Sequence, residues 1–373
     1  MEYSYKFRIY PNQQQTQLIE QTFGCCRFVY NQFLALKINQ YKLSKRPIGF
    51  FECCKILTSL KEIKGWLYDV DSRALQRSLK FLDNAYQNFF RRLKKGEKPG
   101  FPRFKSKHNN RQSFNSTAAS IKVIDNHIKM PKLGVIKCRI SKQVEGRILN
   151  ATISKNPAGK YFVSICCTDI NINCLPNTGK EVGVDLGIKD FAVTSDGEKI
   201  KNPKYLKRYE RFLIKCQRRL SRKSKDSNNR QKQKIRVALI HEKIYNCRKD
   251  FLHKLSTKIV KMYDKIHVET LKIKNMVKNH RLAKCISDVS WGEFVKQLEY
   301  KCSWYGKELI KVDTFYASSQ ICNNCGFKNP VVKDLKIRNW VCPQCNTKHD
   351  RDFNASINIL GWGTPESKLV ETM

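Results

Sequence analysis

The stretch that decides the fold is Glu181–Thr194, which reads EVGVDLGIKDFAVT. It predicts a buried strand, a tight turn at Gly187 and a second strand that Asp196–Gly197 closes. Asp185 lies inside the first apolar run, where an ionised carboxylate is costly unless a cation or hydrogen bonds compensate it. The pattern therefore makes Asp185 a candidate metal ligand, although a hydrogen-bonded structural aspartate would look the same.

Other acidic residues stand at similar places further along the chain. Lys265–Leu271 predicts a short strand that ends in the carboxylate of Glu269, and strands often end so without any function. His349–Ile359 predicts a terminal helix opened by Asp350 and Asp352. An aspartate at a helix N-terminus is also a good cap, so we assign the cap to Asp350 and the candidate ligand role to Asp352. The sequence leaves the reverse assignment open.

Four cysteines form the most specific pattern in the chain, C-x2-C-x16-C-x2-C. Each CxxC places two thiolates on one side of a tight turn, and two such turns complete a tetrahedral sulfur site. A redox CxxC would stand alone beside a helix, and two disulfides would be unstable in a reducing compartment. We therefore expect a zinc ribbon with one structural Zn²⁺ and no open position for catalysis. The ligands are Cys322, Cys325, Cys342 and Cys345.

The charge of the chain indicates a polyanionic partner. There are 72 Lys and Arg against 32 Asp and Glu, a formal net charge of +40. A field of this size attracts nucleic acid and contacts mainly phosphate rather than bases. A membrane surface is the rival polyanion, but no apolar run of about 18 residues and no signal peptide are found in the sequence. We expect a cytoplasmic protein without a membrane partner.

Two segments concentrate this charge. Arg91–Lys105 interleaves basic and aromatic residues with Gly and Pro, which suits phosphate contact and base stacking, although a solvated loop is the alternative. Residues 201–250 hold 18 basic and four acidic residues, and they predict two helices split near Ser227–Asn229. The candidate nucleic-acid contacts are Arg91, Arg92, Lys94, Lys95, Arg103, Lys105, Arg218 and Arg219.

The front half predicts a helical region next to a small β-structure. Tyr5–Tyr10 predicts a strand, Pro11–Asn12 opens a helix, a second helix carries Val29, and a third starts near Asp71–Ser72. Residues 112–170 alternate in short runs typical of a small antiparallel sheet or barrel. If the first strand joins that sheet, the helical region is an insertion in it.

Taken in order, these motifs resemble one known family. GVDLGIKDFAVTSDG, HVETL, SSQICNNCG, VCPQC and HDRDFNASINI look like the RuvC-type core of the transposon-encoded TnpB proteins, and KFRIYPNQQQ with TFGCCRFVYNQFLAL looks like their N-terminal region. The resemblance spans about residues 5 to 362. It implies a multidomain α/β protein, with a RuvC-like RNase H-fold nuclease core, an inserted zinc ribbon and an N-terminal wedge-like β-barrel that carries a helical recognition insertion.

The resemblance also implies an activity. Members are RNA-guided DNA endonucleases related to type V CRISPR effectors and long described as transposases. It implies cleavage of double-stranded DNA next to a short flanking motif, by a monomeric protein with a guide RNA in the prokaryotic cytosol or nucleoid. The catalytic acids fall on Asp185, Glu269 and Asp352, the last because the family's acid precedes x-Asn, here Phe353-Asn354. They would hold two Mg²⁺ or Mn²⁺ ions.

The resemblance implies a domain division as well. The expected parts are residues 1–10 and 111–178 for the barrel, 11–110 for the helical recognition region, 179–315 and 350–363 for the nuclease core, 316–349 for the zinc ribbon and 364–373 for a tail. Three alternatives stay open: a cleavage-deficient RNA-guided repressor, an RNase H-fold transposase that joins strands, and a plain zinc-ribbon DNA-binding protein. The last explains charge and cysteines but gives the acidic residues no role.

Overall fold

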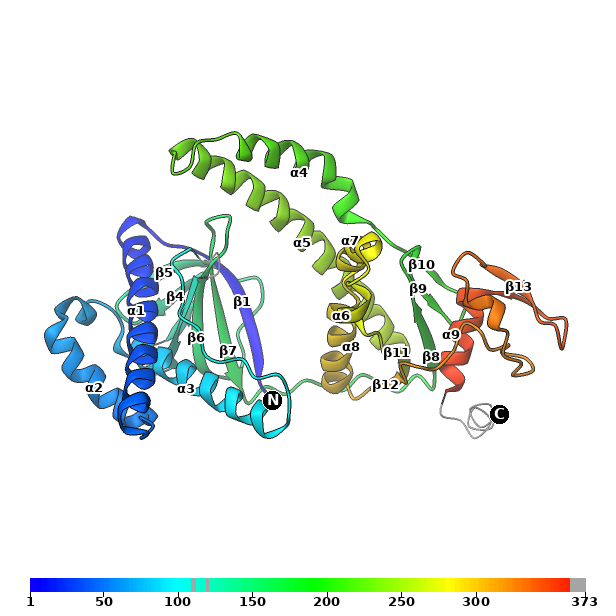
Figure 1. The fold of residues 1–373 in the computed structure, drawn as a ribbon, viewed down its shortest axis with the longest axis horizontal. Helices are drawn as coiled ribbons and strands as arrows, with labels where there is room; N and C mark the ends of the chain where they lie inside the picture. Colours follow the sequence, from blue (N-terminus) through cyan, green and yellow to red (C-terminus); the bar gives the residue numbers. More distant parts are fainter. Residues whose placement is uncertain (109–111, 119–120, 363–373) are drawn as a thin grey trace. The chain divides into compact units, whose positions relative to one another are not determined.

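The computed structural model describes residues 1–108, 112–118 and 121–362 (Figure 1). The expected tail, 364–373, lies outside these residues. The chain divides into two compact units, the first running from Met1 to Asn171 and the second beginning at Ile172. In the described ranges, no helix combines the length and apolar character needed to cross a membrane.

The first unit is built on a seven-stranded antiparallel sheet with the order β2-β6-β7-β1-β5-β4-β3. Strand β1 pairs with both β7 and β5, so the prediction that the first strand joins the later ones is confirmed. Its buried residues Tyr5, Phe7 and Ile9 alternate with exposed ones, which gives the sheet one apolar face. The strands are β1 (Tyr3–Tyr10), β2 (Gln112–Thr117), β3 (Lys122–Ile124), β4 (His127–Met130), β5 (Gly134–Arg139), β6 (Arg147–Lys155) and β7 (Tyr161–Thr168).

Helices fill the segment between β1 and β2. They are α1 (Gln13–Ser44), α2 (Phe50–Ile63), η1 (Gly65–Tyr68) and α3 (Ser72–Lys94). Asn12 caps α1 by accepting a hydrogen bond from the Gln15 amide at 2.8 Å, and Asp71 caps α3 where the sequence predicted. The prediction of two helices before residue 44 is wrong, because α1 is one helix of 32 residues. Gly24 inside α1 costs only about 1 kcal/mol of helix propensity, and burial of the helix compensates it.

The second unit is built on a five-stranded mixed sheet with the order β10-β9-β8-β11-β12. Strand β11 runs parallel to β8 and β12, whereas β8, β9 and β10 pair antiparallel. The strands are β8 (Glu181–Leu186), β9 (Asp190–Thr194), β10 (Lys199–Lys201), β11 (Lys265–Glu269) and β12 (Glu308–Val312). The helices are α4 (Tyr205–Ser221), α5 (Asn228–Met262), α6 (Ile273–Met276), α7 (His280–Val289), α8 (Trp291–Tyr305) and α9 (Arg351–Gly361).

The two faces of this sheet are covered differently (Figure 1). Val182 and Val184 of β8 pack into a buried apolar core with residues of α5 and α8. Because side chains alternate along a strand, Gly183 and Asp185 face the other side, where α9 lies. A Cβ atom on Gly183 would stand 2.0 Å from the backbone oxygen of Ser356. Only glycine therefore lets α9 lie this close to β8 and bring its first turn toward Asp185.

The cysteine-containing segment forms a small ribbon between β12 and α9. Strands β13 (Asn339–Val341) and β14 (Lys348–Asp350) pair antiparallel, and η3 (Pro330–Lys333) precedes them. Val332 and Trp340 pack with two of the cysteines into a separate small core. The ribbon, the strand–turn–strand of β8 and β9, and the division between α4 and α5 at Ser227 all agree with the sequence predictions.

Candidate functional site

Two of the predicted acids meet where parallel strands β8 and β11 end. Val268 pairs with Val184, which places Asp185 and Glu269 one residue further along neighbouring strands. The Leu186 amide donates a hydrogen bond to Glu269 Oε1 at 3.2 Å and orients that carboxylate. Ligands commonly bind outside the carboxyl ends of parallel strands, so the fold directs both acids toward a usable edge.

The carboxylates in this region repel one another. Burial raises the pKa of Asp185 well above its ordinary value, and the negative charges of Glu269 and Asp352 raise it further. Burial likewise raises the pKa of Glu269 to about 7. Because a cation would relieve both the burial cost and the repulsion, these residues fit a divalent metal bound through carboxylate oxygens, the hard ligands that Mg²⁺ and Mn²⁺ prefer.

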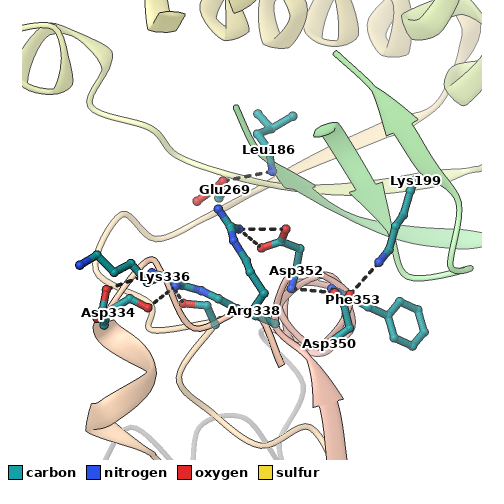
Figure 2. A network of polar contacts seen from close by, with 11 residues as sticks. Leu186, Lys199, Glu269, Asp334, Lys336, Arg338, Asp350, Asp352 and Phe353 are labelled. Carbon is teal, nitrogen blue, oxygen red and sulfur yellow. Dashed lines mark hydrogen bonds and ion pairs between the residues drawn. The ribbon is translucent and has the colours of Figure 1, made fainter. Parts of the chain in front are cut away.

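The structure separates the roles of the two aspartates at the start of α9. Asp350 Oδ1 accepts hydrogen bonds from the amides of Asp352 and Phe353, both at 3.1 Å, and Asp350 Oδ2 accepts one from Lys199 Nζ at 2.6 Å (Figure 2). Partial burial alone would raise the pKa of Asp350, but these hydrogen bonds outweigh it and lower that pKa. The prediction that Asp350 is a helix cap is confirmed.

Asp352 instead faces a residue that sequence reasoning missed. Arg338 Nη1 donates to both carboxylate oxygens of Asp352, at 3.1 and 3.2 Å (Figure 2). Arg338 lies just before β13 in the ribbon, so the pair forms only because the ribbon folds back beside α9. Nothing in the spacing of the motifs signals such a contact, since ordinary sequence patterns report local structure.

The four cysteines come together as a compact sulfur cluster. Their Sγ atoms all lie within 4.8 Å of one another, with Cys322 to Cys345 at 3.6 Å and Cys325 to Cys342 at 3.5 Å. Zinc–sulfur bonds of about 2.3 Å require sulfurs roughly 3.8 Å apart in a tetrahedron, so the donor set fits Zn²⁺. A hydrogen bond from the Thr347 hydroxyl lowers the pKa of Cys345 to about 5, whereas burial raises the pKa of Cys322 and raises the pKa of Cys325 to about 12, so Cys345 is the thiol that most readily gives the metal-binding thiolate.

The acidic residues are not gathered to the same degree. Across the described ranges, the four thiols are the one group of three or more His, Cys, Asp or Glu side chains whose ligand atoms lie close enough together to hold one metal ion. Asp185, Glu269 and Asp352 share one region, as the effect of the other two on the pKa of Asp185 shows. Their carboxylate oxygens are not as close together as the four sulfurs are.

Buried asparagines of α9 connect the two regions. Asn354 Nδ2 donates to the Ile321 carbonyl at 2.7 Å, and Asn358 Nδ2 donates to the same oxygen at 2.7 Å. The Asn323 amide in turn donates to Asn354 Oδ1 at 3.0 Å. The backbone around Cys322 is thus fixed to the helix that carries Asp352. The ribbon therefore positions the acidic helix in addition to holding its own thiols.

All of the predicted nucleic-acid contacts are exposed, although some also bind other residues of the chain, as Arg91 does in donating to Asn88 Oδ1 at 3.1 Å. Arg91, at the end of α3, and Arg218, near the end of α4, are exposed, as are their basic neighbours. Lys105 is another such residue, because its ammonium lies 4.0 Å from the ring centroid of Tyr30 and its backbone is hydrogen-bonded twice to Asn31. Four aromatic residues pack against one another beside the basic end of α3, mostly edge to face. They are Tyr86, Phe89, Phe90 and Phe101.

Three family profiles match successive parts of the sequence. Residues 164–280 match the family described as "Probable transposase", residues 291–359 match the "Cas12f1-like, TNB domain" and residues 1–46 match a "Helix-turn-helix domain". The first two segments contain the acidic strands and the ribbon with α9.

Two relatives are similar over almost the whole chain. A protein of Streptomyces pristinaespiralis is 37% identical over 369 residues, which cover 98% of this chain and 90% of the relative. A protein of Escherichia coli strain K12 is 33% identical, covering 96% of this chain and 92% of the relative. Both carry the description "Putative RNA-guided DNA endonuclease".

Solved structures show the same fold at low sequence identity. The Cas12f1 chain in a complex with single guide RNA and target DNA superimposes with a TM-score of 0.51 at 13% identity, covering 98% of this chain and 99% of that one. A mini-RNA-guided endonuclease of the CRISPR Cas-phi type gives a TM-score of 0.54 at 9% identity, covering 96% of this chain and 92% of that one.

Proposed function

This chain belongs to the TnpB family of RNA-guided DNA endonucleases, and on this premise we propose how its residues act. The protein is an RNA-guided DNA endonuclease of transposon origin. We propose that it cuts double-stranded DNA beside a short flanking motif by metal-dependent hydrolysis at Asp185, Glu269 and Asp352. The observation that carries this proposal is the convergence of two carboxylates with raised pKa values where β8 and β11 end, beside the helix of a third.

Asp185, Glu269 and Asp352 would hold the catalytic ions, two Mg²⁺ or Mn²⁺ in our proposal. When bound, such ions activate a water molecule and stabilise the leaving oxygen. The chain itself prepares the ligands. The Leu186 amide orients Glu269, and Lys199 with the Asp350 cap fixes the first turn of α9. Positive charge from Arg338 and Arg351 partly offsets the repulsion around Asp185 before an ion arrives.

The zinc ribbon has a structural role in this proposal. Cys322, Cys325, Cys342 and Cys345 would hold one Zn²⁺, with no ligand position left open for chemistry. Soft thiolates select zinc and hard carboxylates select Mg²⁺ or Mn²⁺, so the two sites should not exchange ions.

The remaining parts of the chain would bind the nucleic acids. We propose that the seven-stranded sheet is the wedge-like element, with α1 to α3 as the recognition insertion, and that exposed basic residues of both units contact phosphates. The formal charge of +40 supports this proposal, since two polyanions must be held at once. Base pairing with the guide would then supply the sequence specificity. We further propose that one protein chain acts with one RNA.

The test mixes purified protein, its copurifying RNA, Mg²⁺ and a plasmid that matches the guide. We expect linear DNA only when RNA, Mg²⁺ and a suitable flanking sequence are all present. Cleavage that proceeds equally without RNA would overturn the guided mechanism. Guide and target binding without any cleavage would favour a repressor, and joined strands among the products would favour a transposase.

A further inference from the structure

A pocket opens directly beside the acidic edge of the second unit. Its volume is about 230 Å³, and Glu269 forms part of its wall. Most of the other wall residues come from the segments that follow β11 and β12, and they include Leu271, Lys272, Met276 and Tyr316; Val312 of β12 and Ile359 of α9 complete the wall. An apolar wall next to a carboxylate edge suits a flat, partly apolar ligand group better than a bare phosphate.

An exposed aromatic side chain lies between two residues of the pocket wall in the sequence, although it does not line the pocket itself. Phe315 follows the pocket residues Asp313 and Thr314 and is 83% exposed. The turn that presents it is hydrogen-bonded, because Asp313 Oδ1 accepts from the Phe315 amide at 2.8 Å. Exposed apolar side chains are common on their own, so exposure alone decides nothing. The relevant feature is the contact of the Phe315 ring with Lys272, which is a residue of the pocket wall.

A basic side chain accompanies the ring. The Lys272 ammonium lies 4.3 Å from the centroid of the Phe315 ring, and Lys272 comes three residues after Glu269. The two residues belong to different segments, one after β11 and one after β12, which the parallel pairing of these strands brings together. An aromatic face with an adjacent cation is the combination that binds single-stranded nucleic acid, since the ring stacks a base and the cation contacts phosphate.

We propose that Phe315 and Lys272 form a platform that positions the DNA strand being cut. A base next to the scissile phosphate stacks on Phe315, and Lys272 contacts an adjacent phosphate. The apolar residues Leu271 and Met276 in the pocket wall favour a base over the charged backbone, so the base faces the pocket and the backbone passes along the side where Lys272 lies. Phe315 and Lys272 are positioning residues, and the proposal rests on the proposed cleavage at Asp185, Glu269 and Asp352.

The test uses the protein–RNA complex and target duplexes with one abasic nucleotide moved stepwise along the cleaved strand. Wild-type cleavage should slow about tenfold when the abasic position meets Phe315, in line with the cost of losing one stacked base. Phe315→Ala should slow cleavage of the intact duplex about tenfold. Its cleavage rate should fall no further on the abasic duplex that slows the wild type. Phe315→Trp should restore the rate and the abasic effect.

A merely structural role predicts a different result. The platform would be overturned if Phe315→Ala slowed cleavage by the same factor on the intact duplex and on every abasic duplex. It would also be overturned if Phe315→Ala did not slow cleavage at all. Lys272→Ala should raise KM more than it lowers kcat. Val331→Ala removes another exposed apolar side chain of the same unit, 68% exposed, and should change neither rate nor abasic pattern.

A binding experiment separates the platform from the proposed function. Asp185→Ala protein in Ca²⁺ is titrated with single-stranded DNA that carries 2-aminopurine, a fluorescent base. Stacking on Phe315 should change the fluorescence, and the change should disappear in the Asp185→Ala/Phe315→Ala protein. This result would stand even if wild-type protein cut nothing, and identical titrations for the two proteins would refute the platform.

Discussion

The thiol cluster and the acidic edge are both suited to metal, but only the thiol cluster is assembled. Its four sulfurs lie within 4.8 Å of one another and come from residues 322–345. The three carboxylates come from β8, β11 and α9, and one of them, Asp352, is paired with Arg338. Protonated thiols can pack together without repulsion, whereas ionised carboxylates require a cation. The comparison predicts that zinc forms part of folding and that the catalytic ions bind to a structure already folded.

Removal of one thiol should have the largest effect. Structural zinc contributes roughly 10–16 kcal/mol of apparent binding energy in finger peptides, so Cys342→Ser should lose the zinc and unfold the ribbon. Because asparagines fix the ribbon to α9, DNA cleavage should be lost as well. Elemental analysis measures the loss of zinc, and thermal denaturation measures the loss of stability. Cys285→Ser, at an exposed cysteine of α7, is the matched control and should retain one zinc per chain.

Removal of one carboxylate should abolish cleavage without unfolding the protein. Asp185→Ala, Glu269→Ala and Asp352→Ala should each reduce cleavage below detection, and combining them should add no further loss, as for residues that act as a unit. Guide and target binding should survive, since charge elsewhere supplies the affinity. Plasmid assays measure cleavage, and gel-shift assays measure the binding of guide and target. Zinc loss in these variants would contradict the separation of the sites. Asp350→Ala should cleave measurably, because it loses the helix cap and the Lys199 ion pair but no proposed metal ligand.

The effect of pH should also distinguish the two regions. The folded pKa of Glu269 is about 7, above its ordinary 4.5. Its contribution to the stability of the metal-free protein is therefore complete below about pH 4.5 and is lost as pH rises through about 7. A bound cation replaces the proton, so Mg²⁺ should raise Tm more at about pH 8 than at about pH 6. Glu269→Gln should remove most of this difference, and equal Mg²⁺ shifts at both pH values would contradict it.

The Arg338–Asp352 pair should make a smaller contribution. Both side chains are partly exposed, 44% and 24%, and such pairs are worth about 0–1 kcal/mol. Arg338 and a divalent ion compete for the same carboxylate, so Arg338→Gln should tighten divalent-ion binding up to about fivefold. Isothermal titration with Mn²⁺ measures the affinity, with Lys336→Gln as the control for charge in the same loop. Weaker binding in Arg338→Gln would show that Arg338 assists the ion.

Neutralising basic residues remote from the acids in sequence should leave both metal sites unchanged. A protein in which glutamine replaces all four of Arg91, Arg92, Lys94 and Lys95 should show a flatter dependence of log affinity on log salt. The slope should change by up to about 0.9 for each duplex phosphate that is no longer neutralised. Zinc content and cleavage at saturating protein should stay at wild-type values. An unchanged salt dependence would mean that this end of α3 is only a solvated surface.

Local signals in the sequence predicted a large part of the fold. Asp71 was a recognisable helix cap, Ser227–Asn229 a recognisable break between two helices, and the Gly187 turn separated two apolar runs of strand length. The same reasoning failed where local signals were weak. The separate second helix expected at Val29 is part of α1, and α2, from Phe50 to Ile63, was not predicted because its apolar face is narrow and much of it is exposed. The intrinsic helix propensity of residues is a weak guide where tertiary packing decides whether a helix forms.

The sequence alone determined the ligand types, the order of the motifs and the excess of positive charge. Cysteine spacing within 24 residues indicated the thiol cluster, since each CxxC lies in its own tight turn and the two turns are close in the chain. Only the tertiary structure decided that Asp350 is a cap, that Arg338 holds Asp352 and that Lys272 meets Phe315. These contacts depend on the parallel pairing of β11 and β12 and on the close packing of α9 over Gly183. The physical reason is range: caps, turns and periodicity act over a few residues, whereas strand pairing and helix packing join residues far apart in the chain.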